Sequence, residues 1–180
     1  MSINIEPIKK KILVLGLEKS GKTSIILHFI GKINLSDFFS LNNTKNPNIF
    51  NLEKDNIKFS IWDFKGKEAY RNEFLKNFNN YITDAEEIFF VIDIQDFKKF
   101  DLTLTFLQEI IDKLKELNLR IEFTIFLHKY DNDLFERVSD INIENINTLI
   151  EKIIQIIPPE VFHEIYKSTI YTVLDKIHIY

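Results

Sequence analysis

The stretch that decides the fold is Lys11-Ile12-Leu13-Val14-Leu15-Gly16-Leu17-Glu18-Lys19-Ser20-Gly21-Lys22-Thr23. The four residues after Lys11 are apolar, which predicts a buried strand over residues 11–15 that leads directly into a glycine-rich turn. Residues 22–29 then have the character of a helix. A strand, the pattern Gly-x-x-x-x-Gly-Lys-Thr and a helix in this order predict a phosphate-binding loop, because the two glycines allow successive backbone N–H groups to point at one anion. The dipole of the helix favours the same negative charge.

The side chains of this loop suit a nucleotide phosphate and its metal ion. Lys22 offers a mobile cation to the outer phosphates, and the hydroxyl of Thr23 can bind Mg²⁺. At average residue usage the pattern arises by chance in about one in a hundred chains of this length, and a glycine turn without phosphate is the alternative. We expect Lys22 to be catalytic and Thr23 to be a metal ligand. The expected nucleotide contacts of the loop are Gly16, Glu18, Lys19, Ser20, Gly21, Lys22, Thr23 and Ser24.

The rest of the sequence alternates short β-branched and aromatic runs with stretches of helical period, which predicts an α/β fold built from β-α units. We expect a three-layer P-loop NTPase fold with a mostly parallel six-stranded sheet, one antiparallel edge strand and about five helices, the last of them short. A polar loop is expected over residues 34–48. The expected strands cover residues 11–15, 49–52, 57–62, 87–92, 123–127 and 162–168. The expected helices cover residues 22–29, 68–81, 102–114, 146–157 and 171–180.

The composition is that of an ordinary soluble globular protein. Of the 180 residues, 45% are hydrophobic and 28% are charged, with a net charge of -4. We expect one domain over residues 1–180, since the sequence has no internal repeat and no linker. The chain has no cysteine, which excludes a disulfide framework, a cysteine-ligated zinc ion and a cysteine nucleophile. Without a large basic excess, no nucleic acid partner is expected.

Nothing in the sequence predicts export or insertion into a membrane. Residues 1–6 lack a basic region followed by an apolar stretch, and no apolar run approaches the length of a membrane-spanning helix. Ser2 stands where myristoylation requires glycine, and a chain without cysteine cannot be prenylated or palmitoylated. We therefore expect a cytoplasmic protein with no intrinsic membrane anchor.

A second informative segment is residues 59–68, Phe-Ser-Ile-Trp-Asp-Phe-Lys-Gly-Lys-Glu. Asp63 ends a predicted strand, at the place where P-loop nucleotide hydrolases hold a carboxylate on the Mg²⁺ side, so we expect it to be a metal ligand. The alternative is that Asp63 only caps the next helix. Gly66 follows three residues later, and its lack of a side chain would let its N–H approach a γ-phosphate closely.

A third and a fourth segment are typical of a guanine pocket. The carboxylate of Asp131 can accept hydrogen bonds from N1–H and the exocyclic amine of guanine, whereas it would face the lone pair of adenine N1. Lys129 can lay its aliphatic stem along the purine, and residues 167–170 can offer backbone to the base carbonyl. Each of these could instead be a polar surface loop. Because both segments follow predicted strands, we expect them to share one crevice with the phosphate loop. The expected contacts are His128, Lys129, Asp131, Ser168, Thr169 and Ile170.

Together these four segments resemble the Ras-like small GTPases, most closely the Rag/Gtr family of the Rag C/D type, with the Arf branch second. The resemblance rests on residues 12–17, Ile61-Trp62-Asp63-Phe64, residues 91–96, His128 before Lys129-x-Asp131, and residues 168–171. It implies binding of GTP and GDP with Mg²⁺. It also implies that Thr44 is a threonine that closes on Mg²⁺ and the γ-phosphate, which makes it a catalytic, nucleotide-binding and metal-binding residue; the alternative is a turn residue. Gly66 is implied to be catalytic.

The sequence departs from this family at three points. Lys67 takes the place of the glutamine that orients the attacking water, and an ammonium has no acceptor for that water, so we expect slow hydrolysis. A solvated surface lysine is the alternative reading of Lys67. His128 replaces an asparagine that ties the loop to the base. The roadblock-like domain of Rag proteins is absent, which suggests a naturally shortened form or a truncation. His28, His163 and His178 lack the spacing of metal ligands.

The functional expectation is a GTP-dependent molecular switch that hydrolyses GTP slowly, with help from a partner, and controls protein assembly. Its expected partners are an effector or GTPase-activating protein, for which the resemblance suggests the roadblock type, and a second GTPase in a homo- or heterodimer. The alternative is a pseudo-GTPase that binds nucleotide without hydrolysing it. A kinase on the same phosphate loop would instead require a pocket that accepts adenine.

Overall fold

One mostly parallel sheet organises the chain. The computed structural model describes residues 7–31, 46–138, 140–169 and 175–177. Its sheet has seven strands in the order β2-β3-β1-β4-β5-β6-β7. They are β1 (Ile8–Leu15), β2 (Asn48–Lys54), β3 (Ile57–Asp63), β4 (Ala85–Asp93), β5 (Glu122–His128), β6 (His163–Ser168) and β7 (Asp175–Ile177).

The two outermost strands run against the rest. The five inner strands pair in parallel, whereas β2 is antiparallel to β3 and β7 is antiparallel to β6. Strand β5 is buried on both faces after its first residue, as a central parallel strand requires. The predicted fold class and the first six strands are confirmed.

The structure corrects the prediction for the last described segment of the chain. We expected a helix over residues 171–180, but residues 175–177 form the seventh strand, with Lys167 opposite Asp175 in the register. The apolar spacing in this segment favoured a helix. Pairing with the open edge of β6 instead satisfies backbone N–H and C=O groups that an edge strand would expose.

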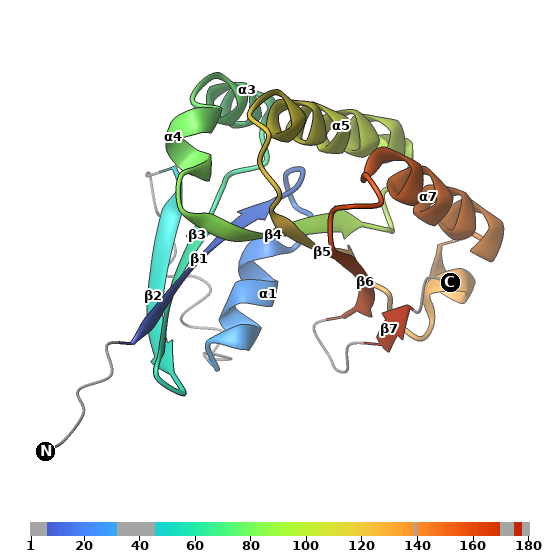
Figure 1. Ribbon diagram of the computed structural model, residues 1–180. Helices are drawn as coiled ribbons and strands as arrows, with labels where there is room; N and C mark the ends of the chain where they lie inside the picture. Colours follow the sequence, from blue (N-terminus) through green and yellow to red (C-terminus); the bar gives the residue numbers. More distant parts are fainter. Residues whose placement is uncertain (1–6, 32–45, 139, 170–174, 178–180) are drawn as a thin grey trace, which may run out of the picture.

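Helices cover both faces of the sheet and make the fold three-layered. Figure 1 shows α3, α4, α5 and α7 over one face and α1 against the other. The helices are α1 (Lys22–Phe29), α3 (Glu68–Lys76), α4 (Phe78–Ile82), α5 (Phe100–Glu116), α6 (Leu134–Arg137) and α7 (Ile143–Ile156), with a 3₁₀ turn, η1 (Phe97–Lys99).

Two helix boundaries differ from the prediction, and an asparagine lies at each. The predicted helix over residues 68–81 is divided at Asn77, whose φ of -104° and ψ of 24° depart from helical values, although its N–H and its side chain both donate to the carbonyl of Glu73. Helix α7 begins at Ile143, earlier than predicted. Asn142 and Asn145 form a reciprocal capping box there, so the cap and not the apolar period sets the start.

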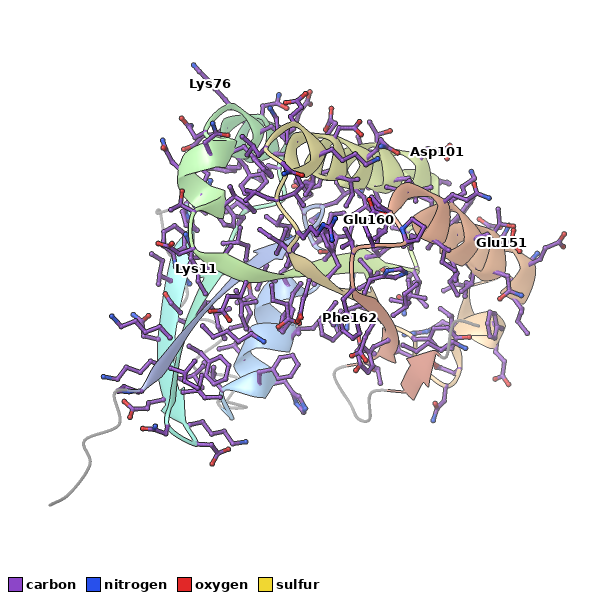
Figure 2. All side chains as sticks on the ribbon, in the orientation of Figure 1. Lys11, Lys76, Asp101, Glu151, Glu160 and Phe162 are labelled. Atoms are coloured by element: carbon purple, nitrogen blue, oxygen red, sulfur yellow. The ribbon has the colours of Figure 1, made fainter. Side chains whose placement is uncertain are left out.

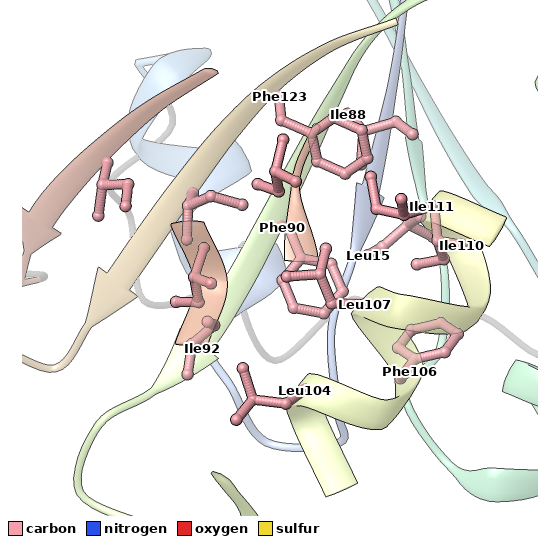
Figure 3. Packing of buried hydrophobic residues seen from close by; sticks show 14 of the residues in the cluster. Leu15, Ile88, Phe90, Ile92, Leu104, Phe106, Leu107, Ile110, Ile111 and Phe123 are labelled. Carbon is pink, nitrogen blue, oxygen red and sulfur yellow. The ribbon is translucent and has the colours of Figure 1, made fainter. Parts of the chain in front are cut away.

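The main core lies between the sheet and α5. Figure 3 shows Phe90 of β4 packed near Leu107 and Ile110 of α5. On the buried face predicted for this helix, Phe106, Ile110 and Leu114 are buried, but Leu102 is 45% exposed. Figure 2 shows Lys76, Asp101 and Glu151 on the outer side of the helical layer. A second cluster, including Val14, Ile26 and Phe126, fills the space between α1 and the sheet.

The topology brings the predicted site segments to one edge of the sheet. The inner strands are parallel, so the segments that follow β1, β3, β4, β5 and β6 all leave from their carboxyl ends. Within the described part of the chain, no helix combines the length and the apolar character needed to cross a bilayer.

Candidate functional site

The loop between β1 and α1 curls into a concave backbone. Gly16, Lys19 and Gly21 have φ angles of 140°, 63° and 94°, all in the region that favours glycine. A Cβ on Gly16 would lie 2.2 Å from the carbonyl oxygen of Val91, so only glycine fits there. Such alternation of backbone conformation directs N–H groups into one concavity, which suits an anion.

Lys22 is buried inside this loop. Its Nζ donates to the carbonyl of Leu17 at 2.6 Å and to that of Gly16 at 3.1 Å, and it lies 3.4 Å from Oγ of Ser20. Burial lowers the pKa of Lys22 to about 8, partly offset by the charge of Asp63. A bound anion would favour the charged form of this ammonium and give it a better partner than carbonyl dipoles.

Thr23 and Asp63 meet across the ends of α1 and β3. The hydroxyl of Thr23 donates to Oδ2 of Asp63 at 2.5 Å. The other carboxylate oxygen, Oδ1, is buried and finds no hydrogen-bond partner among the described residues. Burial raises the pKa of Asp63, against the effect of the Thr23 hydrogen bond. An unsatisfied buried acceptor beside a hydroxyl is the kind of donor set that Mg²⁺ favours.

Gly66 lies directly on the phosphate loop. Its carbonyl accepts a hydrogen bond from the N–H of Glu18 at 3.1 Å. Arg71 Nη1 donates to the same carbonyl at 2.6 Å. A Cβ on Gly66 would lie 2.1 Å from the carbonyl carbon of Leu17, so close backbone approach requires glycine here. Lys67 follows at the N-cap of α3, with an exposed side chain.

His128 connects the end of β5 to the phosphate loop. Its Nδ1 lies 2.9 Å from Oγ of Ser168, and its ring packs on Gly21. Burial and, to a smaller extent, the charge of Lys129 lower the pKa of His128 to about 4. The ring is therefore neutral at physiological pH. Its place between Gly21 and Ser168 joins the two segments that sequence analysis assigned to phosphate and base.

The carboxylate of Asp131 is surrounded by hydrogen-bond donors. Oδ1 accepts from the hydroxyl of Thr169 at 2.6 Å. Oδ2 accepts from Gln95 Nε2 at 3.0 Å and pairs with Arg137 Nη2 at 2.5 Å. Burial raises the pKa of Asp131, but the hydrogen bonds from Thr169, Arg137 and Gln95 outweigh it and lower the pKa overall. Lys129 has a positive φ of 64° and pairs with Asp93 at the end of β4.

A pocket of about 460 Å³ runs between these groups. Of the predicted site residues, the structure brings Lys19, Gly21, Lys22, Thr23, Ser24, His128, Lys129 and Asp131 to its wall. Five more predicted residues contact the residues of this wall without lining the pocket themselves: Gly16, Ser20, Asp63, Ser168 and Thr169. The side chains of Glu18 and Lys67 are exposed. Thr44 and Ile170 lie outside the described residues.

Sequence reasoning missed two residues of the pocket wall, Gln95 and Arg137. Gln95 comes two residues after β4, at the carboxyl edge of the sheet, and a polar residue just after a predicted strand could have been recognised from the sequence. Arg137 lies on the short helix α6, six residues after Asp131, and no sequence pattern marks it.

Comparison with known proteins agrees with this arrangement. A family model described as the Gtr1/RagA G protein conserved region matches residues 11–177. The chain is 29% identical over 142 residues to ADP-ribosylation factor-like protein 2 of Dictyostelium discoideum, covering 77% of this chain and 72% of that protein. It is 30% identical over 122 residues to ADP-ribosylation factor-like protein 3 of Caenorhabditis elegans, covering 67% of this chain and 61% of that protein.

A solved structure shares the fold. The Arl6 BBS3 small GTPase of Trypanosoma brucei, determined with the bound nucleotide analogue GppNp, aligns with a TM-score of 0.59 at 20% identity and covers 90% of this chain and 87% of that one. The resemblance to the Rag/Gtr family, with Arf-like relatives, is confirmed. The chain belongs to the Gtr1/RagA family of G proteins, and as a member of the small GTPases it is a GTP-binding switch protein.

Proposed function

We propose that this chain binds GTP and GDP with Mg²⁺ in the 460 Å³ pocket, hydrolyses GTP slowly and depends on a protein partner for rapid hydrolysis. The observation that carries the proposal is the continuity of this pocket. Its wall runs from Thr23, in the first turn of α1, to Asp131, beyond the end of β5. A single nucleotide needs a phosphate subsite and a base subsite in one continuous pocket, and the carboxyl edge of a parallel sheet is where such pockets form.

The phosphate subsite is the loop around Lys22. Its ammonium is held by three neutral acceptors, and phosphate oxygens are stronger partners because they carry charge. Thr23 and Ser24 line the pocket in the first turn of α1, where the helix dipole also favours an anion.

The metal subsite is formed by Thr23 and Asp63. Within the described residues no group of three or more His, Asp or Glu side chains could hold a metal ion, so protein ligands alone do not build the site. A Mg²⁺ ion commonly takes few protein ligands and completes its shell with water and phosphate oxygens. The unpartnered Oδ1 of Asp63 fits this role. When bound, Mg²⁺ supplies positive charge against the developing charge on the phosphates.

The base subsite is organised by Asp131 and its neighbours. The carboxylate is ionised and faces the pocket, which supports recognition of the two donor groups of guanine. His128 and Ser168 hold the base segment against Gly21, so the two subsites are kept at a constant separation.

Slow hydrolysis is inferred from Lys67. Its side chain is exposed, does not line the pocket and has no acceptor to orient a water. Arg71 donates to the carbonyl of Gly66 and packs over the ring of Phe106. A catalytic group from a partner is worth about three to five powers of ten in rate. Family membership supports an activating or effector protein, of the roadblock type or a second GTPase.

The same position of Lys67 favours a second candidate function, a pseudo-GTPase that uses bound nucleotide only to stabilise an assembly. Multiple-turnover release of phosphate from Mg²⁺-GTP separates the two. We expect slow release above the buffer rate for the wild-type chain and faster release for Lys67→Gln. Absence of release in both, with GTP bound stoichiometrically, would leave the pseudo-GTPase as the function.

A further inference from the structure

One oxygen of the Asp131 carboxylate, Oδ2, already accepts as many hydrogen bonds as it can. Oδ2 receives Gln95 Nε2 at 3.0 Å and Arg137 Nη2 at 2.5 Å, while Oδ1 receives the hydroxyl of Thr169 at 2.6 Å. Each carboxylate oxygen has about two acceptor sites. Oδ1 therefore keeps one free acceptor site, and Oδ2 keeps none.

Guanine brings two donors to this carboxylate, and they need both oxygens. One donor can use the remaining site on Oδ1 beside Thr169. The other requires Oδ2, so either Gln95 or Arg137 must leave that oxygen. The question is which of these two side chains is the more easily displaced.

Gln95 makes a second hydrogen bond that its displacement would break. Its Nε2 donates at the same time to Oδ2 of Asp131 and to the carbonyl of Lys129, at 2.9 Å. Displacing Gln95 would break both hydrogen bonds and would leave the Lys129 carbonyl without this donor. It would also disturb the segment whose backbone has the positive φ at Lys129.

Arg137 is the more exposed of the two side chains, and a second carboxylate lies within its reach. Its side chain is 51% exposed and projects from α6, a helix of four residues. The same Nη2 atom that pairs with Asp131 lies 3.6 Å from Oδ1 of Asp133, one helical turn earlier. A small rotation of the side chain would exchange one carboxylate for the other.

We propose that Arg137 is a latch on the base pocket: it competes with guanine for Oδ2 of Asp131, and Asp133 receives it when the base binds. This inference rests on the proposed reading of guanine by Asp131. The latch lowers the affinity for GTP and GDP and speeds their release. It leaves the binding of a nucleotide that does not use Asp131 unchanged.

The latch makes opposite predictions for two neighbouring side chains. Arg137→Ala removes the competitor, and we expect GDP to bind about 2- to 10-fold more tightly, the range of a partly exposed ion pair. Asp133→Asn removes the alternative partner of Arg137, so GDP should bind more weakly. Asp133 makes no side-chain cap of α6, so this substitution leaves the helix start intact. In an Arg137→Ala background Asp133→Asn should have no effect.

The test is calorimetric titration of the nucleotide-stripped 1–180 chain with GDP and, separately, with ATP, both with Mg²⁺. Tighter GDP binding by Arg137→Ala and by Arg137→Gln, with unchanged ATP binding, is the expected result. This increase in GDP affinity should become smaller at higher salt concentration, because salt screens the Arg137–Asp131 ion pair. Equal or weaker GDP binding by both variants would overturn the latch.

The variant Asp131→Asn shows whether a negative result contradicts only the latch or also the recognition of guanine by Asp131. If this variant loses GDP affinity while Arg137→Ala and Arg137→Gln bind like the wild type, only the latch is wrong. If Asp131→Asn binds GDP as the wild type does, Asp131 does not read the base, and the latch and the proposed base subsite are both wrong.

Discussion

The ring of His128 lies so close to Gly21 that a Cβ at position 21 would be 2.2 Å from His128 Cδ2 and 2.6 Å from Nε2. Gly21 is the N-cap of α1 and His128 ends β5, so this contact joins the phosphate loop to the base segment. The imidazole is neutral and has Ser168 on its other side. This packing gives a structural reason for a histidine where the family resemblance implied an asparagine.

The first prediction concerns Gly21→Ala. The substitution combines a strained φ of 94° with a clash against His128, and we expect a loss of about 2 to 4 kcal/mol of unfolding free energy. Gly31→Ala is the matched control, because Gly31 also has a positive φ, of 70°, but a Cβ there meets nothing within 4 Å. Its loss should be about 1 to 2 kcal/mol. Urea unfolding of the nucleotide-stripped proteins measures both, and equal losses would contradict a role for the His128 contact.

The second prediction is a pH dependence of stability caused by His128. Burial lowers its pKa from 6.5 to about 4, and Lys129 acts in the same direction, against the weaker effects of Asp93 and Asp131. Between these two pH values the unfolded chain binds more protons at this site than the folded one. Stability is therefore fully present above about pH 6.5 and falls, by up to about 3 kcal/mol, as the pH drops toward 4.

The comparison that isolates this effect is His128→Asn. Unfolding free energies of both proteins are measured between pH 4 and 7.5, and the difference between the curves removes contributions from other titrating groups. We expect the wild-type curve to be the steeper one. Parallel curves over this range would show that His128 titrates alike in the folded and unfolded states.

The third prediction concerns Mg²⁺ and Asp63. Since Oδ1 of Asp63 is buried without a partner among the described residues, Asp63→Ala should weaken the dependence of GDP binding on Mg²⁺ by about 10- to 100-fold. In stopped-flow experiments with a fluorescent GDP, chelation of Mg²⁺ should speed release from the wild type and change release from the variant little. Asp84→Ala, at an exposed position, is the control and should behave as the wild type. An unaltered Mg²⁺ response of Asp63→Ala would remove Asp63 from the metal site.

The fourth prediction concerns the rate of hydrolysis. Lys67→Gln restores a side chain that can both accept from and donate to a water, and we expect single-turnover hydrolysis of GTP to rise by up to about 100-fold. Lys65→Gln is the matched control, because Lys65 precedes Gly66 and its ammonium lies 4.9 Å from the ring of Tyr70. It should leave the rate unchanged. A similar rise in both variants would point to loss of positive charge rather than to orientation of water.

Much of the fold was predictable because its signals are local. The apolar run before Gly16 and the phosphate-loop pattern determine a strand, a turn and a helix within a few residues of one another. The period of residues 102–114 likewise predicts an amphipathic helix, and α5 carries its buried face where expected from Phe106 onward. Leu102 was misplaced because the buried face of α5 begins with Thr103 and Leu104 rather than with Leu102.

Elements that depend on distant partners were not predictable. The strand at residues 175–177 exists because β6 has an open edge, and nothing within those three residues indicates it. Asn77 divides a continuous helical pattern through a local change of backbone angles, to a φ of -104° and a ψ of 24°, and the apolar spacing does not indicate this change.

For the candidate site, the sequence by itself determined the chemistry of the loop at Gly16–Thr23 and of Asp131, because residue types and local spacing decide which groups can hold a phosphate or pair with guanine. Only the tertiary structure decided that the carbonyl of Gly66 meets Glu18, that Oδ1 of Asp63 has no described partner, and that Arg137 pairs with Asp131. These relationships join segments brought together by strand order and packing, and no local pattern encodes the distance between them.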